Sequence, residues 1–455
     1  LSLRFSINQL PKELQAAVRA AAVPRFFDRA FLNALLNQPL DEGQFAELLE
    51  QPYVEPYPGE GRFNVHERSR RLLQERLWQE DETLYREISR RAFVYCQRQD
   101  QKDITWRIET IYHQVIADLK KGWIALNNTC ANWVNPPYFA YDRMENLLQA
   151  VYEHNELKRL TEKAKQYILL NQARVDIHYN RCDEAKEALQ QIRQSSLQDD
   201  HYLKLEVLLC LGKVYYLLSM FNDAIQSYDE AMPLCRANKN RLYEADRLQH
   251  LGQVHFCFFD FKKARRYYDK ALLRHNRPLG KANCLLGIGI ILFHLSKFKK
   301  SRSHLKRALK LFQQVGDPAG KANCILYLGK VHLAYSEFPE AQQHFNDSLK
   351  LYRKIENQRG EANTLQSFGD LSVKIGDFIA AKQYYEQTSA LAEHIHCPEG
   401  VIECLEGFAE LHQAQGQVQQ AAEYWQKAAD TYYELSMPLR ADKCLEQVRK
   451  LKKKE

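Results

Sequence analysis

A pattern of small and large residues repeats at a nearly constant interval through most of this chain, and this repetition limits the folds that the chain can adopt. Its most regular members are Ala173, Gly212, Gly252, Gly289, Gly329, Gly369 and Ala409. From each to the next, the position number rises by 39, 40, 37, 40, 40 and 40. A constant period of this length is typical of stacked repeat proteins, in which each unit contacts mainly its neighbours.

The same order of residue sizes follows each of these small residues. A large apolar residue comes 9 positions later, as in Phe261, and a small residue comes 12 positions later, as in Ala224 and Ala341. A ring or Leu comes 16 positions later, as in Tyr228, and another small residue comes 19 positions later. Small side chains allow two antiparallel helices to approach closely, and we expect the ring to fill the space between neighbouring pairs. The one short step, from Gly252 to Gly289, predicts a shorter second helix near residues 274–278.

This pattern resembles the tetratricopeptide repeat, in a long-repeat form with extended helices. The Gly, Ala, aromatic and Ala offsets match that family, whereas its early Trp is absent and its terminal Pro position is mostly not Pro. The resemblance implies an all-α fold, a right-handed superhelical solenoid of helix pairs. We expect about seven repeats over residues 166–438, closed by a C-terminal capping helix over residues 439–455.

The first 100 residues do not repeat. Two short extended runs flank the turn Pro58-Gly59-Glu60-Gly61 and predict one small β-hairpin near residues 53–66. Helices are predicted before and after it, at residues 11–22, 28–36, 42–49, 67–78 and 81–98. Three helices followed by a hairpin form a winged-helix-like arrangement over residues 1–100. Residues 101–165 are predicted to be a helical connector with degenerate repeats, interrupted by Pro136 and Pro137.

The stretch from Phe63 to Leu73, with Tyr85 to Ala92, resembles the end of the winged-helix module of signal-transduction ATPases of the NB-ARC/STAND type. In that family an NTPase core precedes the winged helix, and tetratricopeptide-like repeats follow it. The chain begins at Leu1 without a Met, and we interpret it as a fragment. Because the sequence has no Gly-x-x-x-x-Gly-Lys-Ser/Thr loop, no cofactor is expected here, and ATP is expected only in an upstream domain.

Several other classes of function lack support in the sequence. No long apolar run predicts a membrane span, and no Gly-x-Ser-x-Gly or His-Glu-x-x-His motif predicts an enzyme. There is no Cys-x-x-Cys pair, so the 11 cysteines predict free thiols in a cytoplasmic protein. His394, His396 and Cys397 are interpreted as part of a solvated turn without zinc.

Nucleic acid is also not expected as a partner. The third helix, residues 42–50, would face DNA in a winged helix, and it is acidic. The net charge of +7 is interpreted as spread over the chain, without a single basic stripe.

The candidate site is the concave surface formed by the first helices of the pairs. Three asparagines, Asn283, Asn323 and Asn363, stand six positions before a repeat glycine and one full period apart. A side-chain amide both donates and accepts hydrogen bonds, so it can bind the backbone of an extended peptide. Asparagines have this role in the tetratricopeptide repeat family, which the sequence resembles. A local hydrogen bond at each helix start is the alternative. Further expected groove residues are Lys213, Lys330, Lys374, Leu286, Leu326, Phe256 and Phe293.

The charges of this predicted groove suggest a partner. Lys281 and Lys321 stand beside the asparagines, and the ends are acidic, at Glu206, Asp246, Glu403, Glu406 and Glu410. We expect a protein or peptide partner with an acidic segment, or an internal autoinhibitory segment. The predicted function is the sensor module of a multidomain signal-transduction ATPase, and an oligomer is expected only if a missing domain drives it. A transcription regulator and a plain scaffold adaptor are the alternatives.

Overall fold

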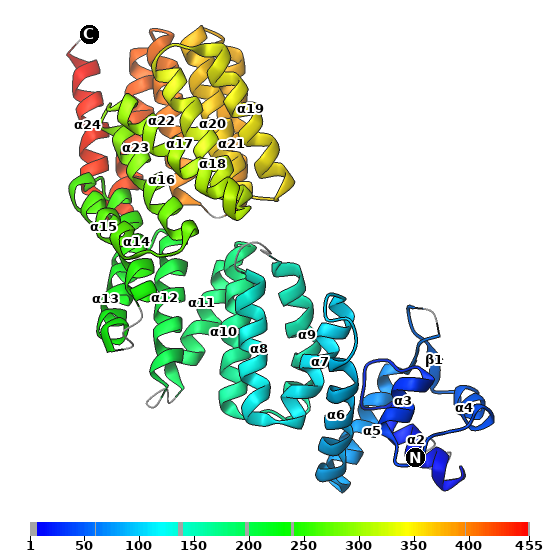
Figure 1. Cartoon of the computed structure of the whole chain (residues 1–455). Helices are drawn as coiled ribbons and strands as arrows, with labels where there is room; N and C mark the ends of the chain where they lie inside the picture. Colours follow the sequence, from blue (N-terminus) through cyan, green and yellow to red (C-terminus); the bar gives the residue numbers. More distant parts are fainter. Residues whose placement is uncertain are drawn as a thin grey trace. The chain divides into compact units, whose positions relative to one another are not determined.

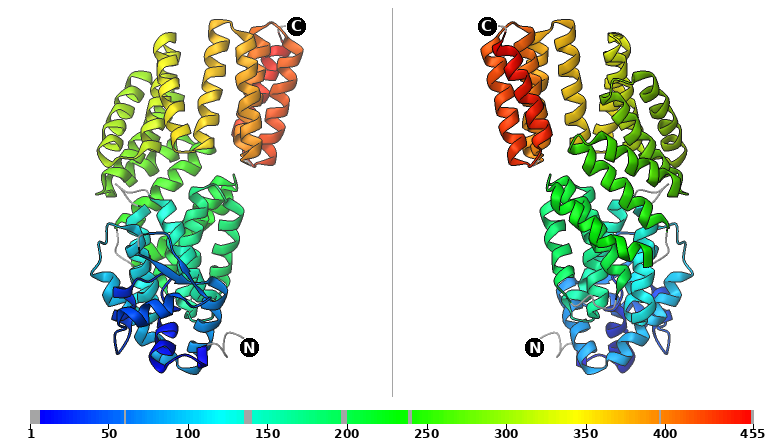
Figure 2. Two further views of the ribbon diagram at one scale, coloured as in Figure 1. Left: turned by 90° about the vertical axis from the view of Figure 1, so that its right-hand side faces the viewer. Right: turned by 90° about the vertical axis from the view of Figure 1, so that its left-hand side faces the viewer.

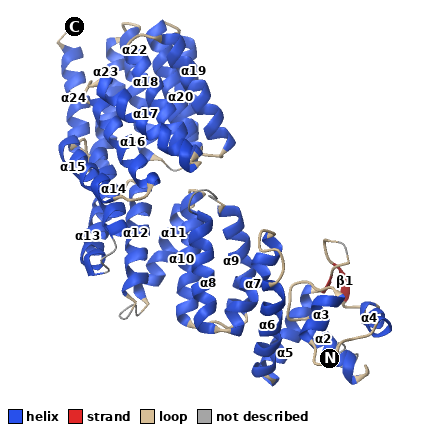
Figure 3. Cartoon of the chain, in the orientation of Figure 1, coloured by secondary structure: helices blue, strands red, loops and turns tan. Residues whose placement is uncertain are grey.

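The computed structural model describes residues 7–59, 61–134, 140–195, 200–237, 241–395 and 397–453 (Figure 1). Its elements are helices except for one two-stranded sheet among these residues (Figure 3). The chain divides into two units, Leu1–Val175 and Asp176–Glu455, and each is described by itself. In the described part of the chain, no helix combines the length and the apolar character that a membrane crossing needs.

Unit 1 contains helices and one hairpin among its described residues. The helices are α2 (Lys12–Ala21), α3 (Arg29–Leu35), α4 (Glu42–Leu49), α5 (Glu67–Glu80), α6 (Glu82–Gln97), α7 (Ile104–Ala117), α8 (Leu119–Val134), α9 (Tyr141–Glu156) and α10 (Glu162–His178), which runs across the boundary. Strands β1 (Val54–Pro56) and β2 (Phe63–Val65) pair antiparallel, with Glu55 opposite Asn64. The hairpin is confirmed, and its order after three helices is as expected. Pro136 and Pro137 lie outside the described residues.

Aspartates begin several helices of unit 1. Asp28, Asp81 and Asp103 each accept a hydrogen bond from a backbone N–H in the first turn of α3, α6 and α7. Asp41 and Gln44 form a reciprocal capping box at the start of α4. These carboxylates satisfy N–H groups that have no partner within the helix, and they favour the positive end of its dipole.

The core of unit 1 includes buried ion pairs as well as apolar side chains. Glu109 on α7 is fully buried, and its carboxylate accepts from Arg25 Nε at 2.8 Å and from the backbone N–H of Arg25 at 2.9 Å. Burial alone would raise the pKa of Glu109, but Arg25 and His113 lower it to about 2. The carboxylate is therefore held in its charged form inside the protein.

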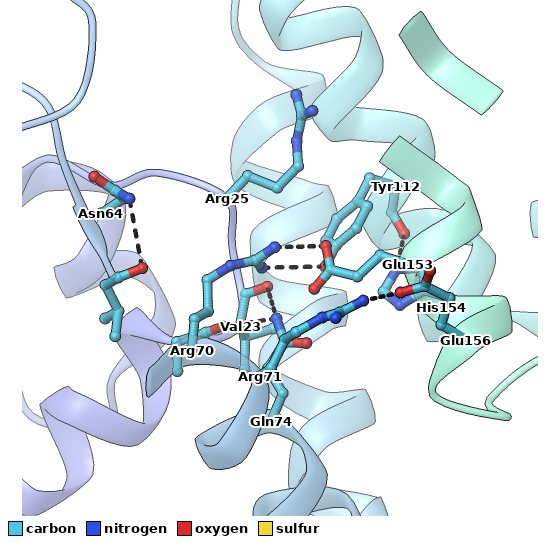
Figure 4. A network of polar contacts seen from close by, with 12 residues as sticks. Val23, Arg25, Asn64, Arg70, Arg71, Gln74, Tyr112, Glu153, His154 and Glu156 are labelled. Carbon is cyan, nitrogen blue, oxygen red and sulfur yellow. Dashed lines mark hydrogen bonds and ion pairs between the residues drawn. The ribbon is translucent and has the colours of Figure 1, made fainter. Parts of the chain in front are cut away.

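A second polar network joins α5 to α9 (Figure 4). Arg70 donates to Glu153, which also accepts from the hydroxyl of Tyr112 at 3.3 Å. On the same helix, Arg71 pairs with Glu156. Polar contacts between side chains therefore help to hold α9 against α5.

Unit 2 is a stack of antiparallel helix pairs (Figures 1 and 2). The helices that follow α10 are α11 (Cys182–Gln194), α12 (His201–Leu217), α13 (Phe221–Ala237), α14 (Arg241–Cys257), α15 (Phe261–Arg274), α16 (Pro278–His294), α17 (Phe298–Val315), α18 (Pro318–Ala334), α19 (Phe338–Lys354), α20 (Gln358–Ile375), α21 (Phe378–His394), α22 (Pro398–Ala414), α23 (Val418–Glu434) and α24 (Pro438–Lys452). The even-numbered helices from α12 to α22 are the first helices of the pairs, and the odd-numbered helices from α13 to α23 are the second helices. The expected all-α repeat solenoid is confirmed. As predicted from the short step, α15 has 14 residues where its counterparts have 17 or 18.

The repeat glycines lie where a ring from the second helix needs their space. A Cβ atom added at Gly369 would stand 2.3 Å from Cε1 of Tyr385, and one at Gly212 would stand 2.4 Å from Cε1 of Tyr228. The ring thus packs on the glycine of its own pair and also lies in the expected place between neighbouring pairs. Tyr385 also reaches the next pair, where a Cβ at Gly407 would be 2.7 Å away. The ring of Tyr385 on α21 therefore packs against α20 in its own pair and against α22 in the next pair.

Two further periodic features support the stack. Prolines occupy the first turn of α16, α18, α22 and α24, where a missing N–H costs nothing. Cys284, Cys324, Cys404 and Cys444 recur at one position of the repeats, and all four are buried.

Candidate functional site

The first helices form the inner, concave side of the stack. Successive first helices such as α16 and α18, or α20 and α22, approach one another closely, whereas successive second helices do not. In a curved double layer, the elements on the inside of the curve are closer together. Contacts over long separations agree, since Asn180 Nδ2 donates to the carbonyl of Ile395 at 3.2 Å.

The asparagine position of the repeats points to this inner side. Its equivalents in the next two repeats are Glu403 on α22 and Lys443 on α24. Lys443 Nζ lies 4.1 Å from the ring centre of Phe259, in the turn after α14, and Glu403 interacts electrostatically with Lys330 on α18. Side chains from helices this far apart in the stack meet only across its inner side.

The three asparagines are half-buried on α16, α18 and α20. Asn323 Nδ2 donates to the carbonyl of Ala319 at 3.2 Å, within its own helix. This is the local bond weighed as an alternative, and it uses one of the two N–H groups of that amide. Among the described residues, the side chains of Asn283 and Asn363 have no hydrogen-bond partner.

The expected lysines differ in their surroundings. Lys330 is half-buried, with Nζ 5.3 Å from the ring centre of Tyr327. Burial lowers the pKa of Lys330, but Tyr327, Asp370 and Glu403 outweigh this effect and raise it, so the ammonium stays charged. Lys213 and Lys374 are exposed.

The apolar residues expected in the groove are only partly available there. Phe256 and Phe293 are half-buried and contact other rings, with Phe256 5.2 Å from His294 between ring centres. Leu286 is half-buried against the core around Phe312. Leu326, by contrast, is only 1% exposed and belongs to the core between α18 and α20, so it cannot line a groove in this structure. At this position of α18, the side chain of Leu326 points into the interior of the helix pair.

A group of carboxylates lies at the C-terminal end of the inner side, as the sequence suggested for Glu403, Glu406 and Glu410. Burial raises the pKa of Glu410 to about 7, and the neighbouring Asp370 and Glu406 contribute. Asp370, which the sequence analysis did not single out, accepts from the hydroxyl of Tyr385 at 3.0 Å. It stands one residue after the repeat glycine, at the position of Lys213 and Lys330, and this equivalence was the signal that could have identified it.

Two arginines complete this end of the site. Arg359 Nη2 lies 3.0 Å from the carboxylate of Glu399. Arg440 on α24 lies over the Phe259 ring at 4.4 Å and bounds a hollow of about 180 Å³, which Phe259, Glu406, Trp425, Lys443 and Cys444 also line. Neither arginine was predicted, because their offsets from the glycine carry other residue types in other repeats.

Within the described residues, no group of three or more His, Cys, Asp or Glu side chains could hold a metal ion. Cys397 is buried, and His396 lies outside the described residues. In unit 1, helix α4 exposes Glu42 and Glu47, as the argument against DNA contact at this helix assumed.

One expectation about charge is wrong. The second helices α15 and α17 together contain twelve Lys or Arg and one acidic residue, Asp269, for a net charge of +11. The whole chain has a net charge of +7, so the remainder is −4. The positive charge is therefore concentrated on two second helices that both pack against α16.

Comparison with known proteins agrees with this architecture. The tetratricopeptide repeat family model matches residues 203–272 and 281–354. The signal transduction ATPase with numerous domains (STAND) that has a tetratricopeptide repeat sensor, from Pyrococcus horikoshii, is similar over 97% of this chain and 66% of its own, with a TM-score of 0.57 and 12% identity.

Two further complexes are also similar in fold. The Rap protein complexed with competence and sporulation factor matches 73% of this chain and 98% of its own, with a TM-score of 0.53 and 16% identity. NprR in complex with its cognate peptide NprX matches 74% and 99%, with a TM-score of 0.54 and 13% identity. At these identities the likeness concerns the fold. Together with the family match and the Gly–ring packing, it shows that the second unit of this chain has the fold of a tetratricopeptide repeat solenoid.

Proposed function

We propose that this chain is a sensor that holds an extended segment of a protein or peptide along the concave side of its repeats. The observation that carries the proposal is the recurrence of Asn283, Asn323 and Asn363 at one inward position on three successive first helices. The fold of the pairs does not require an amide there, since other repeats carry Glu403 or Lys443 at that position.

An amide ladder suits an extended backbone. Each Asn side chain offers two N–H donors and an accepting oxygen, and a peptide backbone presents both kinds of group. The bond from Asn323 to Ala319 leaves one N–H and the oxygen of that side chain for a ligand. A peptide that enters the groove loses water, so its polar groups gain from such partners.

The charge of the site favours an acidic group beside the ladder. Lys281 is exposed, and Lys321 is half-buried, each two positions before an asparagine. Lys213 and Lys374 are exposed on the same set of first helices. The acidic segment or free carboxylate would lie near Lys281 and Lys321, away from the Glu406 and Glu410 end. An internal segment of the protein in an autoinhibited state is an equivalent occupant.

The similar structures support a peptide as the partner, since NprR is in complex with its cognate peptide by its description. Likeness to the STAND sensor protein extends over 97% of this chain. It supports the finer proposal that residues 1–100 are a winged-helix-like domain and that residues 101–165 connect it to the repeats. The repeats would then control an NTPase elsewhere in a longer signal-transduction protein.

The test begins with a displayed library of random peptides selected on the purified chain. For a selected peptide, the dissociation constant is measured with Asn323→Ala and with Asn283→Ala/Asn363→Ala. Each lost amide should cost about 1 kcal/mol, roughly a fivefold loss of affinity, and up to about 3 kcal/mol if it leaves a buried group unpaired.

The control is Asn346→Ala, the same change on the exposed face of the second helix α19. It should leave the affinity unchanged, and circular dichroism checks the fold of all variants. A peptide that loses affinity with Asn346→Ala but not with the ladder variants would place the binding site elsewhere. On the complete gene product, ATP hydrolysis that changes with the peptide tests the link to an NTPase separately.

A further inference from the structure

The basic second helices α15 and α17 present their charge to solvent in a regular row. Six positions of each second helix face outward, and on α17 they hold Lys299, Lys300, Lys306, Arg307 and Lys310 with one serine. All six positions are exposed on both helices. On α15 the same positions carry four cations, one aspartate and one leucine.

The other repeats show that the fold does not require this charge. At the same six positions, α13 has a net charge of −3, and α19, α21 and α23 each have −1, whereas α15 has +3 and α17 has +5. All of these helices bury the same opposite face, through residues such as Ala264, Ala341 and Ala421. The two basic helices are therefore a local exception within one repeated architecture.

Most of these cations form no ion pair with a described residue. Four of the twelve form ion pairs: Lys263 with Asp260, Arg265 with Asp269, Arg274 with Glu244, and Arg302 with Glu337. The other eight, which include all five outward cations of α17, have no ion pair among the described residues. Packing like charges on neighbouring positions has an electrostatic cost that nothing in the described part of the chain offsets.

We infer that the outer surface of α15 and α17 binds the phosphate backbone of a nucleic acid. Each row of outward positions covers roughly 17 Å of helix at about 1.5 Å per residue, and a duplex carries about one negative charge per 1.7 Å along its axis. Lysine and arginine on a rigid surface neutralise such a polyanion without reading its sequence. This contact is separate from the concave groove and from helix α4, whose acidic face gave the expectation against nucleic acid.

The composition of the surface favours nucleic acid over a protein or a membrane. Protein interfaces are depleted in lysine and are anchored by buried aromatic or apolar side chains. On α15 and α17, only Leu273 is an exposed large apolar residue. A helix that enters a membrane surface needs an apolar face, and the apolar faces of these helices are buried in the stack through Tyr268 and Leu305.

The test is fluorescence anisotropy of the whole chain with a labelled 20-base-pair DNA duplex and a 20-nucleotide RNA strand, at several salt concentrations. The variant Lys299→Gln/Lys300→Gln/Lys306→Gln/Arg307→Gln removes four outward cations of α17. It should weaken binding by about tenfold or more, and should lower the slope of log affinity against log salt on the duplex by roughly 3 to 4.

The matched control removes four exposed cations from other second helices, in Lys350→Gln/Lys354→Gln/Lys382→Gln/Lys427→Gln. Both variants change the net charge equally, so a selective loss with the α17 variant supports a site and an equal loss shows only a net-charge effect. Absence of binding at low salt would overturn the inference. So would binding to phosphatidylserine vesicles, lost with the α17 variant, without binding to either nucleic acid.

Discussion

The two units of this protein are stabilised in different ways. Unit 2 repeats one apolar contact, in which a ring such as Tyr385 fills the space over a glycine such as Gly369. Unit 1 has an apolar core that does not repeat, and it adds individual polar contacts between segments far apart in the chain, such as Arg25 with Glu109 and Arg70 with Glu153. The first arrangement repeats one contact at equivalent sites, and the second includes buried polar contacts that occur only once.

This difference predicts how each unit responds to damage. In a repeat array, each pair interacts mainly with its neighbours, so a defect weakens a few pairs and fades with distance. In unit 1, loss of one partner leaves a buried charge without compensation, and the whole core is affected. The predictions below test this contrast, from the largest effect to the smallest.

The largest effect is expected from Arg25→Met. It leaves the carboxylate of Glu109, which is 0% exposed, without its cation, beside His113 at 3.4 Å and the backbone N–H of residue 25. Breaking a buried ion pair from one side typically costs about 3–5 kcal/mol. Urea unfolding followed by tryptophan fluorescence measures this in unit 1, because Trp78, Trp106, Trp123 and Trp133 lie there and only Trp425 lies in unit 2.

Acid provides the control for that measurement. In the wild-type protein the pKa of Glu109 is about 2, below its ordinary value of 4.5, so its contribution is present above pH 4.5 and is lost as the pH falls towards 2. Without Arg25, burial raises the pKa of this carboxyl, and protonation relieves the variant. The stability difference between the two proteins should therefore shrink between pH 5 and pH 3. Protonation of the buried His154, whose pKa burial lowers, occurs in both proteins and cancels.

The sequence predicts unit 2 well and unit 1 only in outline, and the reason is physical. A small residue followed by a ring or Leu at a fixed offset recurs in the repeats, so each repeat supports the prediction for the others. The contact of Arg25 with Glu109 joins residues 84 apart, and no local pattern marks either residue as a partner of the other. The hairpin was predictable because its turn residues are adjacent in the chain.

The candidate site was predictable to a similar, limited extent. The ladder of Asn283, Asn323 and Asn363 follows from the period. Leu326 was assigned to the groove although it is buried, because an offset places a residue on a helix but does not say how its neighbours cover it. The charge of α15 and α17 was present in the sequence, but it becomes visible only when equivalent positions of the second helices are compared.

An intermediate effect is expected from Gly369→Ala. The new Cβ would stand 2.3 Å from Tyr385, whose ring cannot move freely because its hydroxyl donates to Asp370 at 3.0 Å. Overpacking of this kind typically costs about 1–3 kcal/mol. Hydrogen exchange should become faster in α20 and α21, less so in α18 and α22, and hardly in α12.

The matched change is Gly43→Ala in α4, where a Cβ would meet only Asp41 Oδ1, at an ordinary 3.5 Å. Alanine is favoured over glycine inside a helix by roughly 0.5–1 kcal/mol, so this variant should not lose stability. Equal losses of stability in both variants would mean that the contact between Gly369 and Tyr385 does not determine the stability of the array.

The smallest effect is expected from Arg71→Ala, and it sharpens the contrast within unit 1. Arg71 and Glu156 pair between α5 and α9, as Arg70 and Glu153 do, but the side chains of Arg71 and Glu156 are 43% and 44% exposed. Water already solvates both charges and salt screens them, so such pairs typically contribute about 0–1 kcal/mol. The fluorescence unfolding curve of Arg71→Ala should therefore shift little, and raising the salt concentration should remove the remaining difference. A loss as large as that of Arg25→Met would show that polar contacts stabilise unit 1 whether or not they are buried. In that event, burial would not distinguish the polar contacts that stabilise unit 1 from those that contribute little.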